Sequence, residues 1–236
     1  AYAAMAPRSK ATAGVLQQRL SGFRRQQTCT HWPFEFICLD PPAALGEPSA
    51  DAMRLALDAG APPSTPMAEL VLSLGKAPQK RLWEICEGSR VSLADLVPDE
   101  LAEDTEVRHL GRNSLPLFTR FEKRFLRPSG LAEDDEPQLW GYNFQTLQAV
   151  TGPGYFVCAM DPDRDSAAID YRRVPPRAPE GWPAVRVNDR GLSTLVYGHM
   201  VDHLRKVSSE VIIGRAWKHG GWLPHTFLLV RVPVDS

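Results

Sequence analysis

Two histidines and a carboxylate lie within five residues of one another, in the sequence His199-Met-Val-Asp-His203. Imidazole nitrogens and carboxylates are ligand types that zinc prefers, and a catalytic zinc needs three protein ligands and one open position. The flanking residues are typical of a strand, which does not give the helical spacing of a two-histidine zinc motif. We therefore predict no metal here and expect these side chains on a strand edge or cavity wall. An enzyme that works through His199, Asp202 and His203 is the third of three functional hypotheses.

Other patterns that would indicate a reaction are missing. Cys29, His31 and Cys38 have a spacing that matches no common zinc finger or ribbon, so we expect buried thiols there. The chain has no G-x-S-x-G nucleophile motif, no G-x-x-x-x-G-K-[ST] phosphate loop and no G-x-G-x-x-G. We predict no cofactor, and a protein that is not an enzyme is favoured over one that is.

Large aromatic residues recur between residues 140 and 222, together with histidine and arginine. Such rings fill protein cores, and they also line small-molecule sites beside a few polar groups. The sequence leaves both readings open. If the rings line a cavity, Arg205 or Arg215 would bind a polar head group such as a carboxylate. The residues that we predict for this ligand site are Tyr155, Tyr171, Tyr197, His199, Met200, His203, Arg205, Arg215 and Trp217.

The segment from Leu115 to Val232 consists of short runs of β-branched, aromatic and aliphatic residues bounded by Gly, Pro, Asp or Ser. This pattern is typical of strands and turns. Residues 155–160 and 167–171 flank the turn sequence Asp161-Pro-Asp-Arg-Asp, which predicts a hairpin. The last three runs predict a meander. We therefore expect an antiparallel sheet that closes into a barrel or curls strongly.

Three helices with clear start and stop residues precede the strands. They are expected over residues 49–58, 66–74 and 78–87, and a short serine-capped turn begins at Ser92. The fold class is α+β, with N-terminal helices packed on the barrel. The predicted organisation is an extended N-terminal arm over residues 1–45, a helical segment over 46–110 and a barrel domain over 111–236.

Composition excludes some classes of protein. A net charge of −1 excludes a general nucleic-acid binder, which would carry a strong basic excess. No apolar run approaches the roughly 18 residues of a membrane-spanning helix, so we do not expect the chain to span a membrane. The first 34 residues contain Arg and Ser but no Asp or Glu, as the remainder of an organellar targeting segment does. An organelle such as a plastid is favoured, although an engineered or arbitrary start is equally compatible.

Several of these segments resemble small lipocalin-like domains that are named for a Gly-x-Trp-x-Gly motif. The resemblance is carried by Val201-Asp-His-Leu-Arg-Lys-Val, by Val211-Ile-Ile-Gly-Arg-Ala, by Ile169-Asp-Tyr171 and by Phe121-Glu-Lys-Arg-Phe125. It covers residues 115–232, and the naming motif itself is missing. The resemblance implies a closed or nearly closed antiparallel barrel that can hold one apolar molecule. It implies no defined activity.

The leading hypothesis from the sequence is non-enzymatic binding of a small hydrophobic ligand, such as a lipid or pigment, inside this barrel. The long Pro- and Gly-rich connection over residues 174–194 is expected to cover the cavity, because such loops are uncommon unless they carry function. The second hypothesis is an extrinsic structural subunit of a larger assembly that contacts a protein partner through its N-terminal arm. Whether the barrel is hollow decides between them.

Overall fold

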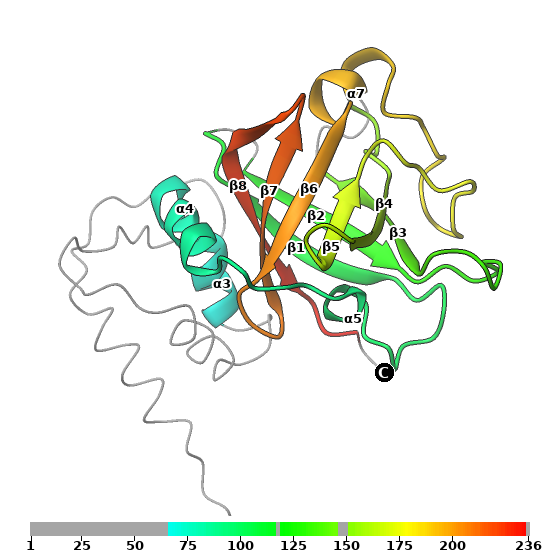
Figure 1. The fold of residues 1–236 in the computed structure, drawn as a ribbon, viewed down its shortest axis with the longest axis horizontal. Helices are drawn as coiled ribbons and strands as arrows, with labels where there is room; N and C mark the ends of the chain where they lie inside the picture. The colour runs from blue at the N-terminus through cyan, green and yellow to red at the C-terminus, as the bar shows by residue number, and fades with distance from the viewer. Residues whose placement is uncertain (1–65, 117–118, 146–150, 235–236) are drawn as a thin grey trace, which may run out of the picture.

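The computed structural model describes residues 66–116, 119–145 and 151–234. Eight antiparallel strands pair in chain order and close into a barrel, because β1 also pairs with β8 (Figure 1). The strands are β1 (Val107–Asn113), β2 (Arg120–Leu126), β3 (Gln138–Phe144), β4 (Phe156–Asp161), β5 (Ser166–Asp170), β6 (Met200–Lys206), β7 (Val211–Lys218) and β8 (Gly221–Arg231). The predicted antiparallel barrel, with its β4–β5 hairpin and its final meander, is confirmed. Its first strand begins within the segment that was expected to be helical.

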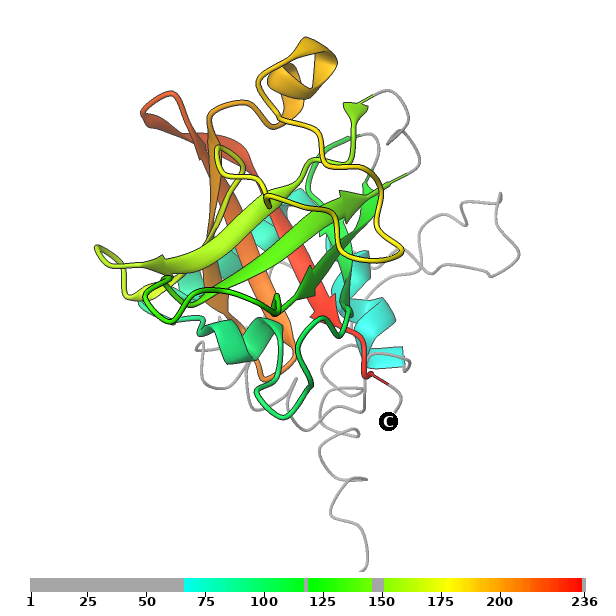
Figure 2. The same ribbon diagram turned by 90° about the vertical axis from the view of Figure 1, so that its right-hand side faces the viewer.

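Short helices lie around the barrel. α3 (Pro66–Ser73) and α4 (Lys76–Ile85) lie against its outer face, on the side of β1, β7 and β8. Figure 2 shows α7 (Gly191–Val196) at one end of the barrel and α5 (Leu93–Leu96) at the opposite end. Ser92 caps α5 as predicted, and its hydroxyl accepts from the backbone of Asp95. The helix expected over residues 49–58 lies outside the described residues.

Phenylalanine rings packed over glycines fill much of the barrel. A side chain pointing inward from one strand must fit against the strands beside it, and a glycine leaves room for a ring. Three such pairs are direct cross-strand partners: Gly111 with Phe121, Gly141 with Phe156, and Gly214 with Phe227. Phe125, Ile169 and Leu229 are 0% exposed. The interior is therefore packed with the protein's own side chains, as a solid core is.

We expect the Gly214→Ala substitution to lower the free energy of unfolding by about 2 kcal/mol. An added Cβ at this position would lie 2.1 Å from Cζ of Phe227, so the ring and its neighbours would have to move. Gly221→Ala is the matched control on the next strand of the same pair, because its Cβ meets no atom within 4 Å. Urea unfolding followed by circular dichroism measures both. Equal losses in the two variants would show that ring-over-glycine packing does not carry this stability.

A second core lies outside the barrel, under α4. Leu82 and Trp83 of α4 are buried there against β7 and β8. Gln79 is fully buried and anchors the helix: its amide nitrogen donates to the carbonyl of Leu74 at 2.9 Å, and its amide oxygen accepts from the hydroxyl of Thr226 at 3.1 Å. A buried polar group needs such partners. These bonds fix α4, and with it Trp83, on the outer face.

The connection between β5 and β6 follows the outer face of the barrel before it reaches α7. Trp182 packs edge-on against Tyr142 with ring centroids 4.8 Å apart, and its indole nitrogen donates to Glu106 at 2.7 Å. The buried amide of Asn188 donates to the carbonyls of Tyr155 and Tyr171. The first part of the expected cavity cover therefore covers strands rather than a cavity. Only the last residues of this connection, from about Asn188 onward, lie at an end of the barrel.

Candidate functional site

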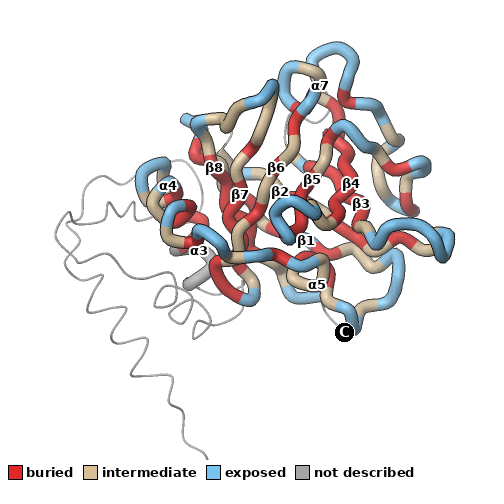
Figure 3. The backbone as a smooth tube through the Cα atoms, in the orientation of Figure 1, coloured by how far each residue is buried: buried red, intermediate tan, exposed pale blue. Residues whose placement is uncertain are grey.

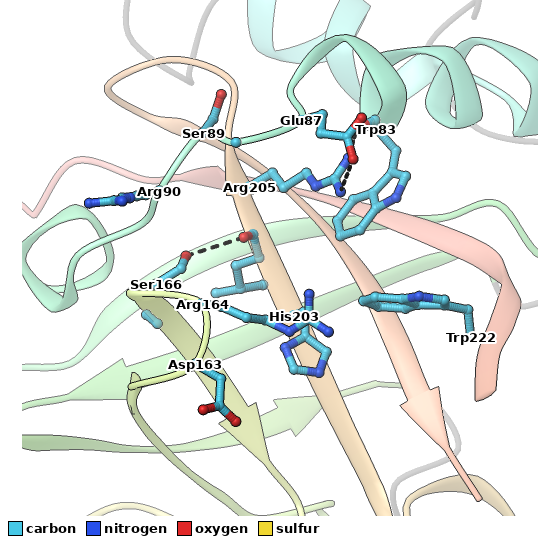
Figure 4. A pocket seen from close by; sticks show the side chains of 13 residues that line it. Trp83, Glu87, Ser89, Arg90, Asp163, Arg164, Ser166, His203, Arg205 and Trp222 are labelled. Atoms are coloured by element: carbon cyan, nitrogen blue, oxygen red, sulfur yellow. Dashed lines mark hydrogen bonds and ion pairs between the residues drawn. The ribbon is translucent and has the colours of Figure 1, made fainter. Parts of the chain in front are cut away.

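A cleft of about 410 Å³ opens on the outside of the barrel (Figure 4). His203 and Arg205 on the outer face of β6 form its floor. The end of α4 and the residues after it form one wall, and the β4–β5 turn forms the opposite wall. Trp222, from the start of β8, completes the lining. In Figure 4, Trp83 and Trp222 stand on one side of the cleft and Ser166 on the other.

Two indole rings and the guanidinium groups beside them form the apolar side of the cleft. The rings of Trp83 and Trp222 meet edge to face with centroids 5.7 Å apart. The guanidinium carbon of Arg205 lies 3.9 Å from the Trp83 centroid, and that of Arg164 lies 5.2 Å from the Trp222 centroid. Arg205 also donates to the carbonyl of Trp83. Stacking holds both guanidinium groups in place, and Nε of Arg164 also lies 3.6 Å from a carboxylate oxygen of Asp161. The terminal N–H groups of Arg164 can still donate to a ligand.

The charges of the cleft are partly neutralised from its rim. Burial and the nearby Arg164 lower the pKa of His203, so its imidazole is neutral at pH 7, with Nδ1 3.4 Å from a carboxylate oxygen of Asp161. Burial also lowers the pKa of Arg205, and Glu87 opposes that shift from 3.7 Å. The side chain of Glu87 is 82% exposed, so this ion pair is weak. Arg205 can therefore bind another anion.

The predicted ligand residues lie on both faces of the sheet, because successive residues of a strand point to opposite sides. His203 and Arg205 line the cleft, and Arg215 and Trp217 lie beside it, where each contacts the ring of Trp222. Inside the barrel are Tyr171, Tyr197 and Met200. Tyr155 is buried under Trp182, and His199 is exposed in a turn with a φ of 58°. The structure therefore brings together only part of the predicted set.

The predicted residues that point inward belong to the packed core. The rings of Tyr171 and Tyr197 stack with centroids 5.2 Å apart, and Gln145 donates to the hydroxyl of Tyr197 at 2.8 Å. Burial raises the pKa of both phenols, so both stay neutral. Of the two readings that the sequence left open for the aromatic residues, core filling describes these two rings.

A buried ionic cluster also lies inside the barrel. The ammonium of Lys123 donates to the side-chain oxygen of Asn143 at 2.8 Å and to the hydroxyl of Tyr171, and it lies 3.3 Å from a carboxylate oxygen of Asp202. The side chains of Lys123 and Asp202 are each 3% exposed. Burial lowers the pKa of Lys123 and raises that of Asp202, while their attraction opposes both shifts. The barrel encloses this cluster, so the cluster belongs to the core and not to an open site.

The residues of the H-x-x-D-H sequence do not converge. Asp202 points into the barrel, His203 points into the outer cleft, and His199 lies in an exposed turn beside the ring of His219. Among the residues that the structure describes, no group of three or more His, Cys, Asp or Glu side chains could hold a metal ion. Cys29, His31 and Cys38 lie outside this part of the chain.

Several residues of the cleft were not predicted as site residues. Trp83 lies four residues after Gln79 and three before Cys86, which are both buried, so helical periodicity places it on the face that packs on the sheet. Arg164 lies in the β4–β5 turn, where nothing in the local sequence distinguishes it from a solvated charge. Trp222 meets Trp83 across more than half of the described chain. This contact is set by the packing of α4 on β8, which the spacing in the sequence does not predict.

Comparison of the chain with family models, curated proteins and solved structures gave no match. The described helices are all too short or too polar to cross a lipid bilayer.

Proposed function

We propose that this protein binds a small molecule in the outer cleft, without catalysing a reaction. The ligand has a planar apolar part that packs against Trp222 and an anionic group, such as a carboxylate, that binds Arg164 or Arg205. The observation that carries the proposal is the pairing of two indole rings with these two guanidinium groups around one open volume. The interior of the barrel is filled, so the proposed ligand lies outside it.

The size and lining of the cleft support this class of ligand. A volume of about 410 Å³ lies within the range of small-molecule sites. Such sites combine apolar walls with a few placed polar groups, as the indole rings and the arginines do here. Guanidinium groups bind carboxylate and related anions through paired hydrogen bonds. The partial burial of Arg205 removes part of its hydration, which strengthens such a bond.

We expect 8-anilinonaphthalene-1-sulfonate, a planar aromatic anion, to bind the folded protein at one site. Arg164→Gln should weaken this binding about tenfold, because a hydrogen bond to a charged group is worth roughly 1.5–3 kcal/mol. Arg205→Gln should have an effect of similar size. Fluorescence titration measures the dissociation constant, and the uncharged N-phenyl-1-naphthylamine should bind more weakly and respond less to both substitutions.

The control is Arg172→Gln, which removes an exposed arginine that pairs with Asp170 away from the cleft. It should leave the dissociation constant unchanged. Unaltered binding in the Arg164 and Arg205 variants would exclude the cleft as the site. Binding by several equivalent probe molecules would indicate adhesion to exposed apolar surface instead.

Kinship with lipocalin-like domains remains part of the proposal, and the closed eight-stranded antiparallel barrel supports it. Fold alone does not establish function, so the ligand proposal rests on the cleft. The filled barrel favours the alternative, an extrinsic structural subunit, over a ligand inside the barrel, but not over a ligand in the outer cleft. That alternative also depends on an N-terminal arm over residues 1–45, which lies outside the described residues.

A further inference from the structure

Large hydrophobic side chains are exposed almost entirely at one end of the barrel. Seven such residues are exposed in the part of the chain that the structure describes. Six of them are Leu115, Phe144, Val187, Leu192, Leu195 and Val196, and the seventh is Val234. Leu195 is the most exposed at 75%, and Leu192 follows at 52%. Figure 3 shows α7, which carries three of them, as an exposed segment. Clustered apolar exposure of this kind marks an interaction surface.

The topology places these six residues at the same end. In an antiparallel barrel, the connections that follow β1, β3, β5 and β7 all begin and finish at one end. Leu115 lies in the first of these connections, and Phe144 ends β3. The other four residues lie in the last part of the third connection, where Asn188 donates to the carbonyls of Tyr155 and Tyr171 at this end. Val234 follows β8 and therefore lies at the opposite end. We call residues 187, 192, 195 and 196 the apolar tip.

Cations accompany the apolar tip. Residues 186–199 contain exposed Arg186 and Arg190 and one acidic residue, Asp189. Lys218, at the end of β7, reaches the same place, because its ammonium donates to the carbonyls of Leu195 at 3.0 Å and Thr194 at 3.3 Å. Three cationic side chains and one acidic side chain therefore accompany the apolar tip.

The opposite end of the barrel has the reverse charge. The segments at that end are residues 95–106, 127–137, 161–166 and 206–210, which lead into β1 or follow even-numbered strands. Together they contain fourteen Asp or Glu residues and three Arg or Lys residues. A molecule with this separation of charge orients its basic end toward an anionic surface and its acidic end away from it.

We propose that the apolar tip docks on an anionic lipid surface. Leu192, Leu195 and Val196 would enter the boundary between head groups and acyl chains, and Arg186 and Arg190 would contact the lipid phosphates. Peripheral attachment of this kind uses buried apolar area together with electrostatic attraction, and the tip has both. A second copy of the chain is a poorer fit, because a two-fold contact between tips would bring like charges together. The proposal is independent of the cleft and its ligand.

Cosedimentation of the full chain with vesicles tests this proposal. Vesicles of phosphatidylcholine with about one third phosphatidylserine should bind the protein, and vesicles of pure phosphatidylcholine should bind it at least about tenfold more weakly. Leu195→Asp should reduce binding to the mixed vesicles about tenfold or more, because it removes the most exposed apolar side chain and adds a negative charge. Raising the salt concentration from 0.1 to 0.5 M should also release the protein.

Val234→Asp is the matched control, since it places the same charge on an exposed aliphatic position at the opposite end of the barrel. Its binding should equal that of the unmodified chain. Equal binding of Leu195→Asp and Val234→Asp would overturn the proposal, as would the absence of binding to mixed vesicles. Sedimentation velocity adds a further check. A concentration-dependent dimer that Leu195→Asp abolishes would show that a second copy covers the tip instead of lipid.

Discussion

Replacing Lys123 by methionine should destabilise the barrel by about 3–5 kcal/mol at pH 7. The substitution keeps the length of the side chain but leaves Asp202 buried without its cation, 3% exposed and surrounded by core residues. Asp202 must then remain ionised in an apolar interior or bind a proton, and each costs free energy. Urea unfolding followed by circular dichroism gives the free energy of unfolding.

The double variant Lys123→Met with Asp202→Asn separates this penalty from simple loss of contacts. Asparagine keeps the shape of the carboxylate without its charge and can still accept from the hydroxyl of Tyr171, which lies 3.3 Å from Asp202. We expect the double variant to be more stable than the Lys123→Met variant, because no uncompensated charge is left. The single variant Asp202→Asn completes the comparison. If the double variant loses as much stability as the two single variants together, Lys123 and Asp202 contribute independently.

The Lys123→Met variant should also acquire a pH dependence of its own. Burial raises the pKa of Asp202 even beside Lys123, and removal of the cation raises it further. A carboxyl whose pKa is higher in the folded state than in the unfolded state favours folding at low pH, and that contribution is lost as the pH rises. The difference in the free energy of unfolding between the unmodified protein and the Lys123→Met variant should therefore decrease as the pH falls from 8 to 5. Arg172→Met, which removes the exposed partner of Asp170, should cost less than about 1 kcal/mol.

The barrel was predictable from the sequence because its strands are short, apolar and separated by strong turn residues. The face of each strand was harder to predict. In β4, Phe156 and Cys158 point inward while Val157 packs outside with Trp140, so both faces are apolar. Alternation identifies the inner face only where the outer face is polar. For this reason the predicted ligand set mixed residues of the core with residues of the outer cleft.

The ionic cluster and α7 were missed for different reasons. Alternation places Phe121 and Lys123 on one face of a strand, but a lysine on that face is read from sequence as solvent contact. Its partner Asp202 is 79 residues away, and only barrel closure brings the two together. α7 spans six residues with three exposed aliphatic side chains, which is too short and too one-sided for helical periodicity to reveal.

His109 is a further polar side chain that the barrel encloses. It lies on β1 with 0% exposure, and its ring meets Phe125 edge to face at 5.0 Å. Neither ring nitrogen makes a hydrogen bond of normal geometry, although the backbone of Val107 is near enough to favour the protonated ring slightly. Burial is the largest cause that lowers the pKa of His109 to about 3, and the positive charges of Arg231 and Lys123 add to it.

The unmodified protein should therefore lose stability on acidification through His109. Below pH 6.5 the unfolded chain binds a proton at this histidine and the folded chain does not, so the free energy of unfolding falls by about 1.4 kcal/mol per pH unit until the folded pKa is reached. His109→Leu removes this term, so the difference in stability between the two proteins should change by about 2–3 kcal/mol between pH 7.5 and pH 4.5. Urea unfolding at four pH values measures that difference, with His219→Asn, in an exposed turn, as the control for loss of one histidine. A difference that stays constant with pH would mean that His109 binds its proton at the same pH in the folded barrel as in the unfolded chain, and that a partner or water reaches its ring.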